Sequence, residues 1–308
     1  MPTTILGNMS ADLLIPKVKL EYLIRSAPYR YKVYQIPKRT GVGLRTIAQP
    51  AKEVKTIQYW VVENIFPKLR IHQAASAYIP GKNILHNAEV HSDKPYLLKI
   101  DFCDFFPSIK GDDFFKYSQE NNDISFSEAD LHRLVRILFW LPKRNNDLQL
   151  SIGAPSSPFL SNSIMFNFDS QIFNYCVEND ICYTRYADDL VFSMHNMEKR
   201  GEVLAKVEEI LASQAFPTLK INNRKTVFGS KAHRRIVTGL ILSNDGAVSL
   251  GRGRKRRIRA QIHHMLQGKL SEEEISNLRG MLAFARDIEP GFVERMEIRY
   301  GKQLIVMM

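Results

Sequence analysis

Cysteines and long apolar runs are scarce in this chain. Its 308 residues include only three cysteines, at positions 103, 176 and 182, and no two of them form a CxxC pair. This spacing points away from a disulfide scaffold and from a four-cysteine zinc site, and it favours a reducing cytoplasm. No run of about 18 apolar residues is present, and the first ten residues lack the charged and then apolar pattern of an export signal. We therefore expect neither a membrane-spanning helix nor secretion.

Acidic residues are in short supply relative to basic ones. The chain carries 43 Lys and Arg against 32 Asp and Glu, which gives a formal net charge of +11 and a pI of about 9.5. This surplus favours a polyanionic partner such as nucleic acid, although a basic protein without such a partner would carry the same charge. With 44% hydrophobic residues and no internal repeat, the chain can bury a core in one or two domains.

Helical and strand patterns are mixed along the first 250 residues. Apolar periodicity predicts helices at 10–26, 52–69, 111–119, 127–141, 155–179 and 197–212. Alternating or apolar β-rich segments predict a hairpin within 29–50, a buried strand from Tyr96, two short strands within 181–194, and further strands at 219–222, 225–228, 235–242 and 247–250. From Gly251 onward only helical patterns remain, at 254–267, 271–286 and 290–300. These patterns predict an α+β fold with a domain boundary near residue 250.

Three aspartates follow or join apolar strands. Asp101 ends the segment YLLKID, and Asp188 and Asp189 form the turn between the two short strands within 181–194. Ionised carboxylates beside buried strands are costly unless a cation or hydrogen bonds compensate them. If the strands are neighbours in one sheet, the acids meet in an all-oxygen site suited to Mg²⁺. Two such ions, about 3.5–4 Å apart, support in-line phosphoryl transfer, which is the chemistry of polymerases.

The segments around these aspartates resemble those of reverse transcriptases. The sequence YADD at 186–189 matches the YxDD box of that family, and IDFCDFF at 100–106 matches its first catalytic block. RTIAQP at 45–50, GAPSSPFLSN at 153–162 and LKINNRKT at 219–226 follow in the order that the family has. The resemblance therefore covers about residues 30–250.

Two shorter motifs narrow the resemblance to retron reverse transcriptases. The segment from Asn87 to His91 fits the NAxxH pattern, and Val237-Thr238-Gly239 fits the VTG triplet. The resemblance implies a right-hand polymerase, with fingers and a palm with an antiparallel sheet over residues 1–250 and a helical, basic thumb over 251–308. We expect residues of both motifs to contact RNA, and the VTG triplet to help select the cognate RNA.

The resemblance also implies roles for individual residues. The metal ligands would be the carboxylates of Asp101, Asp188 and Asp189, with help from the backbone carbonyl of Phe102. Phe106 would be an aromatic steric gate that favours dNTPs over ribonucleotides, with an ordinary core ring as the alternative. Arg45 would contact the triphosphate, and Lys225 would protonate or neutralise the leaving pyrophosphate. Where many relatives have Gln, this chain has Ile152, so the contact to the incoming nucleotide there falls to backbone groups around Gly153.

A cluster of basic residues precedes and opens the helical C-terminal region. Between residues 231 and 259 nine Lys and Arg side chains face a single acid, Asp245. Those that we expect to bind RNA phosphates are Arg252, Arg254, Lys255, Arg256, Arg257 and Arg259.

The function implied by the resemblance is RNA-directed DNA synthesis. The enzyme would copy part of a structured non-coding RNA into a single-stranded DNA that stays joined to that RNA, with priming from the 2′-hydroxyl of a guanosine. Its partners would be that RNA, the DNA product, dNTPs and a separate effector protein in bacterial defence against phage. The alternatives are a free-standing group II intron-like or diversity-generating reverse transcriptase, and a non-catalytic RNA-binding scaffold that restrains a toxin.

Overall fold

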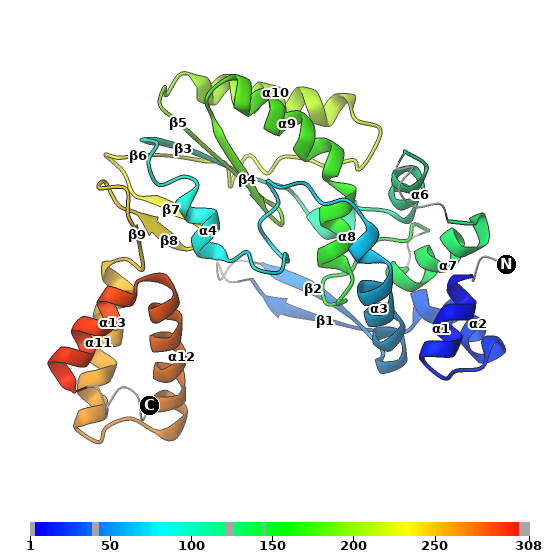
Figure 1. Cartoon of the computed structure of the whole chain (residues 1–308), viewed down its shortest axis with the longest axis horizontal. Coiled ribbons are helices and arrows are strands. Elements are labelled where there is room, and N and C mark those ends of the chain that lie inside the picture. Colours follow the sequence, from blue (N-terminus) through cyan, green and yellow to red (C-terminus); the bar gives the residue numbers. More distant parts are fainter. Residues whose placement is uncertain (1–3, 39–42, 121–125, 144–145, 302–308) are drawn as a thin grey trace.

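A four-stranded antiparallel sheet forms the centre of the molecule. The structure is a computed structural model, which describes residues 4–38, 43–120, 126–143 and 146–301. The strand order is β4 (Cys182–Tyr186), β5 (Asp189–Met194), β3 (Tyr96–Asp101) and β6 (Val227–Ser230). Helices α9 (Phe166–Glu178) and α10 (Lys199–Ser213) lie side by side over one face of this sheet (Figure 1). The antiparallel sheet and the apolar strands β3, β4 and β5 were predicted from the sequence and are confirmed.

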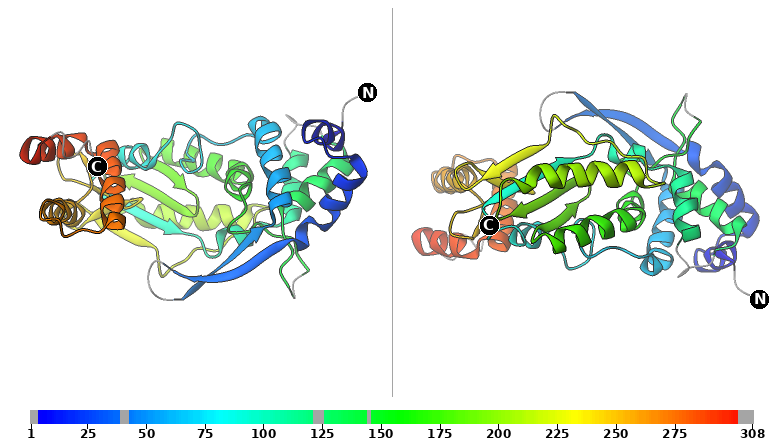
Figure 2. Two further views of the ribbon diagram at one scale, coloured as in Figure 1. Left: turned by 90° about the horizontal axis from the view of Figure 1, so that it is seen from below. Right: turned by 90° about the horizontal axis from the view of Figure 1, so that it is seen from above.

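The N-terminal half packs around this sheet and extends to one end of the molecule (Figure 2). A hairpin joins β1 (Tyr31–Pro37) to β2 (Leu44–Pro50), as predicted. The helices of this half are α1 (Ile5–Asp12), α2 (Lys17–Ser26), α3 (Lys52–Asn64), α4 (Ile84–Glu89), α5 (Phe105–Ser108), α6 (Gly111–Glu120), α7 (Glu128–Leu138) and α8 (Ser157–Ile164), with short 3-10 turns at Ala27–Tyr29 and Phe66–Lys68. Most of them share one continuous core with the central sheet.

Three of the predicted helices are shorter than their apolar periodicity indicates. The helix predicted at 10–26 is divided into α1 and α2 because Leu14 adopts a left-handed φ of 53° and Pro16 caps the second helix. The helix at 52–69 ends at Asn64, before Pro67. The helix at 155–179 is divided between α8 and α9 at Met165. In each case the helix is interrupted, although the apolar spacing in the sequence continues across the interruption.

The part of the chain from β7 onward forms a second unit at the opposite end (Figure 2). A small sheet of β7 (Arg235–Val237), β8 (Leu240–Leu242) and β9 (Val248–Ser249) leads into α11 (Arg252–Leu266), α12 (Glu272–Ile288) and α13 (Pro290–Tyr300). Helix α12 begins at a capping box, in which Ser271 and Glu274 exchange side-chain and backbone hydrogen bonds. The three predicted C-terminal helices are thus confirmed.

This second unit has its own hydrophobic core, and the core crosses the predicted boundary. It contains Val237, Leu240, Leu242 and Leu250 from the small sheet together with the inner faces of α11, α12 and α13. Ala88 of α4, Leu97 of β3 and Val191 of β5 also belong to it. The predicted boundary at residue 250 lies just before the start of α11. The second core nevertheless contains residues from both sides of this boundary.

Two predicted strands have a different form. Residues 219–222 make only an isolated bridge, between Ile221 and Phe102. The strand at 235–242 is a hairpin, because Thr238 and Gly239 have φ values of 46° and 83° and turn the chain between β7 and β8. Within the VTG triplet, Val237 therefore ends β7, and Thr238 and Gly239 form the turn.

Candidate active site

The three predicted aspartates come together at one end of the central sheet. Asp101 and Asp189 are direct partners in the register of β3 and β5. Asp188 lies in the tight turn between β4 and β5, where Ala187 has a left-handed φ of 57°. The backbone N–H of Phe102 donates to the carbonyl oxygen of Asp188 at 3.2 Å, which ties the turn to the end of β3. The sequence prediction that the three acids meet is thus matched by the strand pairing.

Burial and neighbouring negative charge raise the pKa values of Asp188 and Asp189. Burial, together with the charges of Asp189 and Asp101, raises the pKa of Asp188 to about 6. Burial also raises the pKa of Asp189, and Asp101 adds to the effect. A cation at this end of the sheet would relieve both penalties.

Lys225 supplies one positive charge to the site. Its Nζ lies 3.0 Å from Oδ2 of Asp101 and 3.1 Å from Oδ1, and the Asn222 amide donates to the same carboxylate at 3.2 Å. Burial opposes the charge on Lys225, but the hydrogen bond to Asp101 and the charges of Asp188 and Asp189 raise its pKa. Lys225 is therefore protonated at neutral pH, and it is paired with Asp101.

The donor set fits hard divalent cations. Carboxylate oxygens and a backbone carbonyl are the ligands that Mg²⁺ prefers, and here three carboxylates share one buried edge. Within the described ranges, however, no group of three His, Cys, Asp or Glu side chains is already arranged as a ligand cluster. Asp101 is instead paired with Lys225, so ion binding requires side-chain adjustment at Asp101.

A buried ion pair that we did not predict from the sequence stabilises the hairpin of β4 and β5. We call it the catalytic hairpin, because it carries the candidate catalytic residues Asp188 and Asp189. Arg185 and Asp169 are both fully buried, and the guanidinium makes three hydrogen bonds of 2.7–3.1 Å to the carboxylate. Arg185 also donates to the carbonyl oxygen of Ala187 in the turn and to the side chain of Asn162, and Tyr183 donates to Asp169. A charged residue within each of two apolar segments, CYTRY and FNFDSQIF, was the signal in the sequence.

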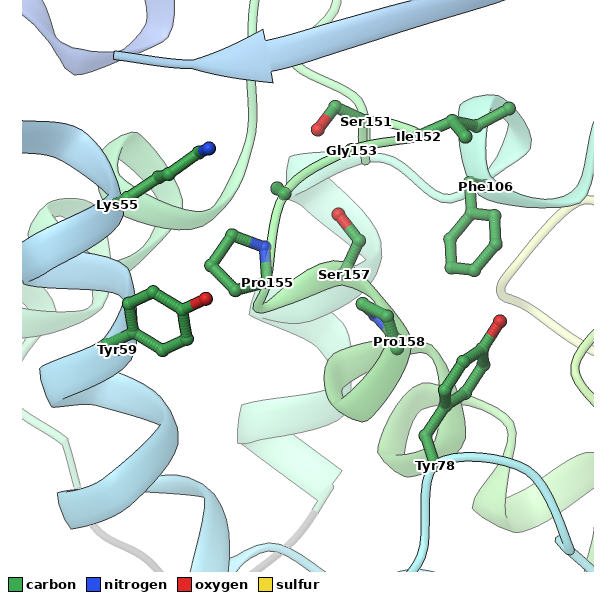
Figure 3. Close-up of a pocket in the computed structure, with 11 residues that line it drawn as sticks. Lys55, Tyr59, Tyr78, Phe106, Ser151, Ile152, Gly153, Pro155, Ser157 and Pro158 are labelled. Atoms are coloured by element: carbon green, nitrogen blue, oxygen red, sulfur yellow. The ribbon is translucent and has the colours of Figure 1, made fainter. Parts of the chain in front are cut away.

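A pocket of about 310 Å³ lies between α3, Tyr78 and the segment that leads into α8 (Figure 3). Phe106, Ile152 and Gly153 line it, with Ser157 and Pro158 at the start of α8. The Phe106 ring contacts Phe105 edge to face at 5.3 Å and also faces the pocket, so it combines core packing with an exposed surface. Of the residues predicted to contact the incoming nucleotide, Phe106 and Gly153 line this cavity, whereas Arg45 and Lys225 do not.

Gly153 allows strand β2 to pass close to this pocket. It has a φ of 124°, and an added Cβ would lie 3.2 Å from the carbonyl oxygen of Ala48 and 3.1 Å from the Ile47 side chain. The Ala48 N–H donates to the carbonyl oxygen of Ile152 at 2.9 Å. Arg45 is exposed on the same strand, and its charge is near enough to lower the pKa of Tyr78, which burial raises.

The expected RNA contacts of Asn87, His91 and Val237 are not compatible with their burial. All three side chains are at most 1% exposed. His91 makes hydrogen bonds to Thr184 of β4 at 2.8 Å and to Ser193 of β5 at 2.9 Å, and burial lowers its pKa to about 3. The NAxxH segment therefore stabilises the catalytic hairpin from within the protein.

Thr238 and Gly239 of the VTG turn are at least partly accessible and lie near α4. We call α4 the NAxxH helix, because it contains the first residues of that motif, Asn87 and Ala88. The Thr238 hydroxyl donates to the carbonyl oxygen of Ile84 in α4 at 3.3 Å, and Gly239 is exposed beside Arg254. The VTG turn and α4, about 150 residues apart in sequence, thus meet at the joint between the central sheet and the C-terminal unit.

The basic cluster divides into free and internally bound side chains. Lys255 pairs with Glu289 at 2.5 Å, and Arg254 is half-buried over the Phe284 ring. The acid Glu289 is distant in sequence, which is why the cluster looked nearly free of acids. Arg252, Arg256, Arg257 and Arg259 are exposed along α11, and of these Arg259 lies over the Phe292 ring.

Comparisons with known proteins agree with this geometry. The family model "Reverse transcriptase (RNA-dependent DNA polymerase)" matches residues 36–247, which is more than half of the chain. The Retron Ec83 reverse transcriptase of Escherichia coli is 44% identical over 288 residues, covering 92% of each chain. The Retron Ec86 reverse transcriptase of the same species is 34% identical, covering 96% of this chain and 91% of the relative.

A solved structure extends the likeness to the fold. An apo telomerase from Candida tropicalis superposes with a TM-score of 0.52 at 13% identity, over 97% of this chain and 64% of that one. Within the residues that the structure describes, no helix has the length and apolar character to cross a bilayer.

The sequence matches favour the retron branch over the group II intron-like and diversity-generating alternatives, and they argue against a non-catalytic scaffold. The chain belongs to the retron reverse transcriptases and is an RNA-directed DNA polymerase.

Proposed function

We propose that the enzyme copies part of a structured non-coding RNA into a single-stranded DNA that stays joined to that RNA. The observation that carries this proposal is the joint at which the VTG turn contacts the NAxxH helix, beside the exposed arginines of α11. A surface for structured RNA there would be continuous with the catalytic hairpin, because the turn that follows α4 also supports β4 and β5 through His91. Shape and 2′-hydroxyl contacts on a basic surface suit such RNA.

The proposed active site assigns a task to each group. Asp101, Asp188 and Asp189, with the Phe102 carbonyl, would hold the divalent cations, which we take to be two Mg²⁺ ions. When bound, such ions activate the attacking hydroxyl and neutralise charge on the leaving pyrophosphate. The protonated Lys225 would hold or donate a proton at the pyrophosphate oxygen.

The nucleotide would occupy the pocket beside Phe106. Its sugar would pack against the Phe106 ring, which leaves no room for a 2′-hydroxyl. Arg45 would reach the triphosphate from β2, and backbone groups at Gly153 would replace the amide that Ile152 cannot supply. Residues 1–250 would form fingers and palm, and α11, α12 and α13 the thumb.

Priming from the 2′-hydroxyl of a guanosine and a role in phage defence with an effector protein complete the proposal. The proposed location is the cytoplasm. The test is to express the chain with the RNA gene next to it, purify the protein and digest the bound nucleic acid with RNase and DNase. A DNA of one length that carries an RNase-resistant ribonucleotide branch supports the proposal. Bound RNA without attached DNA, or DNA of many lengths, contradicts it.

The defence role has a separate test. Cells that carry the complete locus should resist phage, and cells in which Asp188→Asn replaces the wild-type enzyme should lose that resistance. Equal plaque counts with and without the locus, over a panel of phages, would contradict the defence role and leave DNA synthesis unaffected.

A further inference from the structure

Lys99 lies one row behind the candidate catalytic acids on the same face of the central sheet. Strand alternation puts the side chains of Lys99 and Asp101 on one face of β3, and Asp189 of β5 lies directly beside Asp101. Leu98 and Ile100, which point the other way, belong to the main core on the side that α9 and α10 cover. The opposite face of the sheet, near its acidic edge, therefore carries a lysine as well as the carboxylates.

The ammonium group of Lys99 is available to a ligand. The side chain is half-buried, and within the described part of the chain it forms no ion pair or hydrogen bond. Val227, its register partner on the neighbouring strand β6, is 55% exposed, so this row of the sheet opens to solvent. Burial raises the pKa of Asp189 and the charge of Lys99 acts in the opposite direction, which places the ammonium group within electrostatic range of that carboxylate. Lys225, by contrast, is occupied by Asp101.

The nucleotide pocket and the C-terminal unit lie on opposite sides of the acids. Leu97, two residues before Lys99 on β3, packs in the core of the C-terminal unit, whereas Phe106, five residues after Asp101, lines the pocket. In Figure 1, α3 and α8, which border the pocket, lie to the right of the central sheet, and α11, α12 and α13 lie to its lower left. Lys99 is therefore on the side of the acids that faces the C-terminal unit.

The primer strand must pass over this side of the acids. The proposed function, on which this inference rests, puts the sugar of the incoming nucleotide against Phe106 and the metal ions at the three aspartates. The attacking hydroxyl must then lie at the ions, and the rest of the primer must extend away from the incoming nucleotide, toward Lys99. Two residues of an antiparallel strand span about 7 Å, so Lys99 is one short step behind the acids. The nearest anionic group of the primer on that side is the phosphodiester on the 5′ side of the priming nucleotide.

We propose that Lys99 is a positioning residue that binds the phosphodiester on the 5′ side of the priming nucleotide. A lysine is a compact charge with three donors that rotate onto a phosphate oxygen. The contact would hold the end of the primer so that its hydroxyl stays at the metal ions. It would do so for a DNA end and for a guanosine of the RNA alike, because a phosphate contact positions a strand without reading its sugar or base. Lys99 and Lys225 would then act on the two sides of the new bond, at the primer and at the leaving pyrophosphate.

The test compares Lys99→Gln with the wild type on two primers that differ by one charge. Both are DNA primers annealed to one RNA template, and in one of them a neutral methylphosphonate replaces the phosphodiester on the 5′ side of the last nucleotide. For the wild type, the KM for the primer should rise roughly 5- to 12-fold with the neutral linkage, between the values for an exposed ion pair and for a charged hydrogen bond. For Lys99→Gln, that KM should be raised to the same level on both primers, while the KM for dNTP stays that of the wild type.

Matched controls separate this contact from a general loss of charge. Lys99→Arg retains the charge, and it should keep the sensitivity to the neutral linkage. Lys206→Gln makes the same substitution on α10, over the other face of the sheet, and should behave as the wild type. A methylphosphonate at the far end of the primer should affect the wild type and Lys99→Gln equally.

Three results would overturn the inference. An equal effect of the neutral linkage on the wild type and on Lys99→Gln would assign that phosphodiester to other side chains. No effect on the wild type, a measurement that needs no variant, would exclude a contact to this charge. A changed Mg²⁺ requirement in Lys99→Gln without a changed KM for the primer would mean that Lys99 only compensates the charge of Asp189. Failure of the proposed function would instead show as the absence of branched DNA from cells, which these primer assays do not require.

Discussion

Removal of the charge on Asp169 should destabilise the whole molecule. In Asp169→Asn the fully buried guanidinium of Arg185 loses its counter-charge and its three hydrogen bonds to a carboxylate. Breaking one partner of a buried ion pair costs roughly 3–5 kcal/mol, a large part of the roughly 5–15 kcal/mol that stabilises a typical domain. If the free energy of unfolding of the wild type is near the lower end of this range, about 5 kcal/mol, the urea concentration at the unfolding midpoint should fall by more than half.

A surface pair provides the matched control. Lys206 and Glu209 are paired at 2.8 Å, close to the 2.7 Å of the buried pair, but the Glu209 side chain is 65% exposed. Glu209→Gln makes the same change from carboxylate to amide, and it should alter the free energy of unfolding by less than about 1 kcal/mol. Urea titrations of both variants, followed by circular dichroism, give the comparison. Equal losses in the two variants, or a loss below about 1 kcal/mol in Asp169→Asn, would refute the reasoning from burial.

Three further changes test the site itself. Phe106→Ala should raise the ratio of ribonucleotide to deoxynucleotide incorporation, because removal of the ring opens room for a 2′-hydroxyl; an unchanged ratio would mean that Phe106 only packs the core. Replacing Thr238 and Gly239 with Ala should reduce priming on the cognate RNA more than extension of an annealed DNA primer, and equal losses in both assays would assign the turn to palm stability. Because the pKa of Asp188 is raised to about 6, its protonation as the pH falls toward about 6 should increase the Mg²⁺ concentration needed for half-maximal synthesis; a constant Mg²⁺ requirement across that range would contradict the assignment.

The parts of the fold that the sequence predicts well depend on local pattern. The apolar segment that ends at Asp101 and the β-rich segments on either side of Asp188 needed only alternation and composition, and their pairing follows from the sheet. Helix ends were harder to predict, because Leu14 and Met165 interrupt chain segments whose apolar spacing continues across the break. A periodic pattern reports which face is buried and does not report where the axis changes direction.

The parts that were missed depend on contacts between distant segments. His91 looked like a polar residue available to RNA, and only the packing of the turn after α4 against β4 and β5 buries it. Lys255 looked unpaired because its partner Glu289 lies 34 residues away. Arg185 and Asp169 each stand within an apolar segment, which is a sign of a buried pair, but the sequence does not say which charges meet.

The measurement that tests the central claim most directly is DNA synthesis by Asp188→Asn and Asp101→Asn in Mg²⁺. Each change removes a metal-ligand charge from the acidic edge but leaves the exposed arginines of α11 in place, so synthesis should be abolished while RNA binding remains nearly intact. Primer extension and filter binding on the same preparations separate the two activities. Synthesis at the wild-type rate by either variant would contradict the assignment of these carboxylates as the catalytic centre.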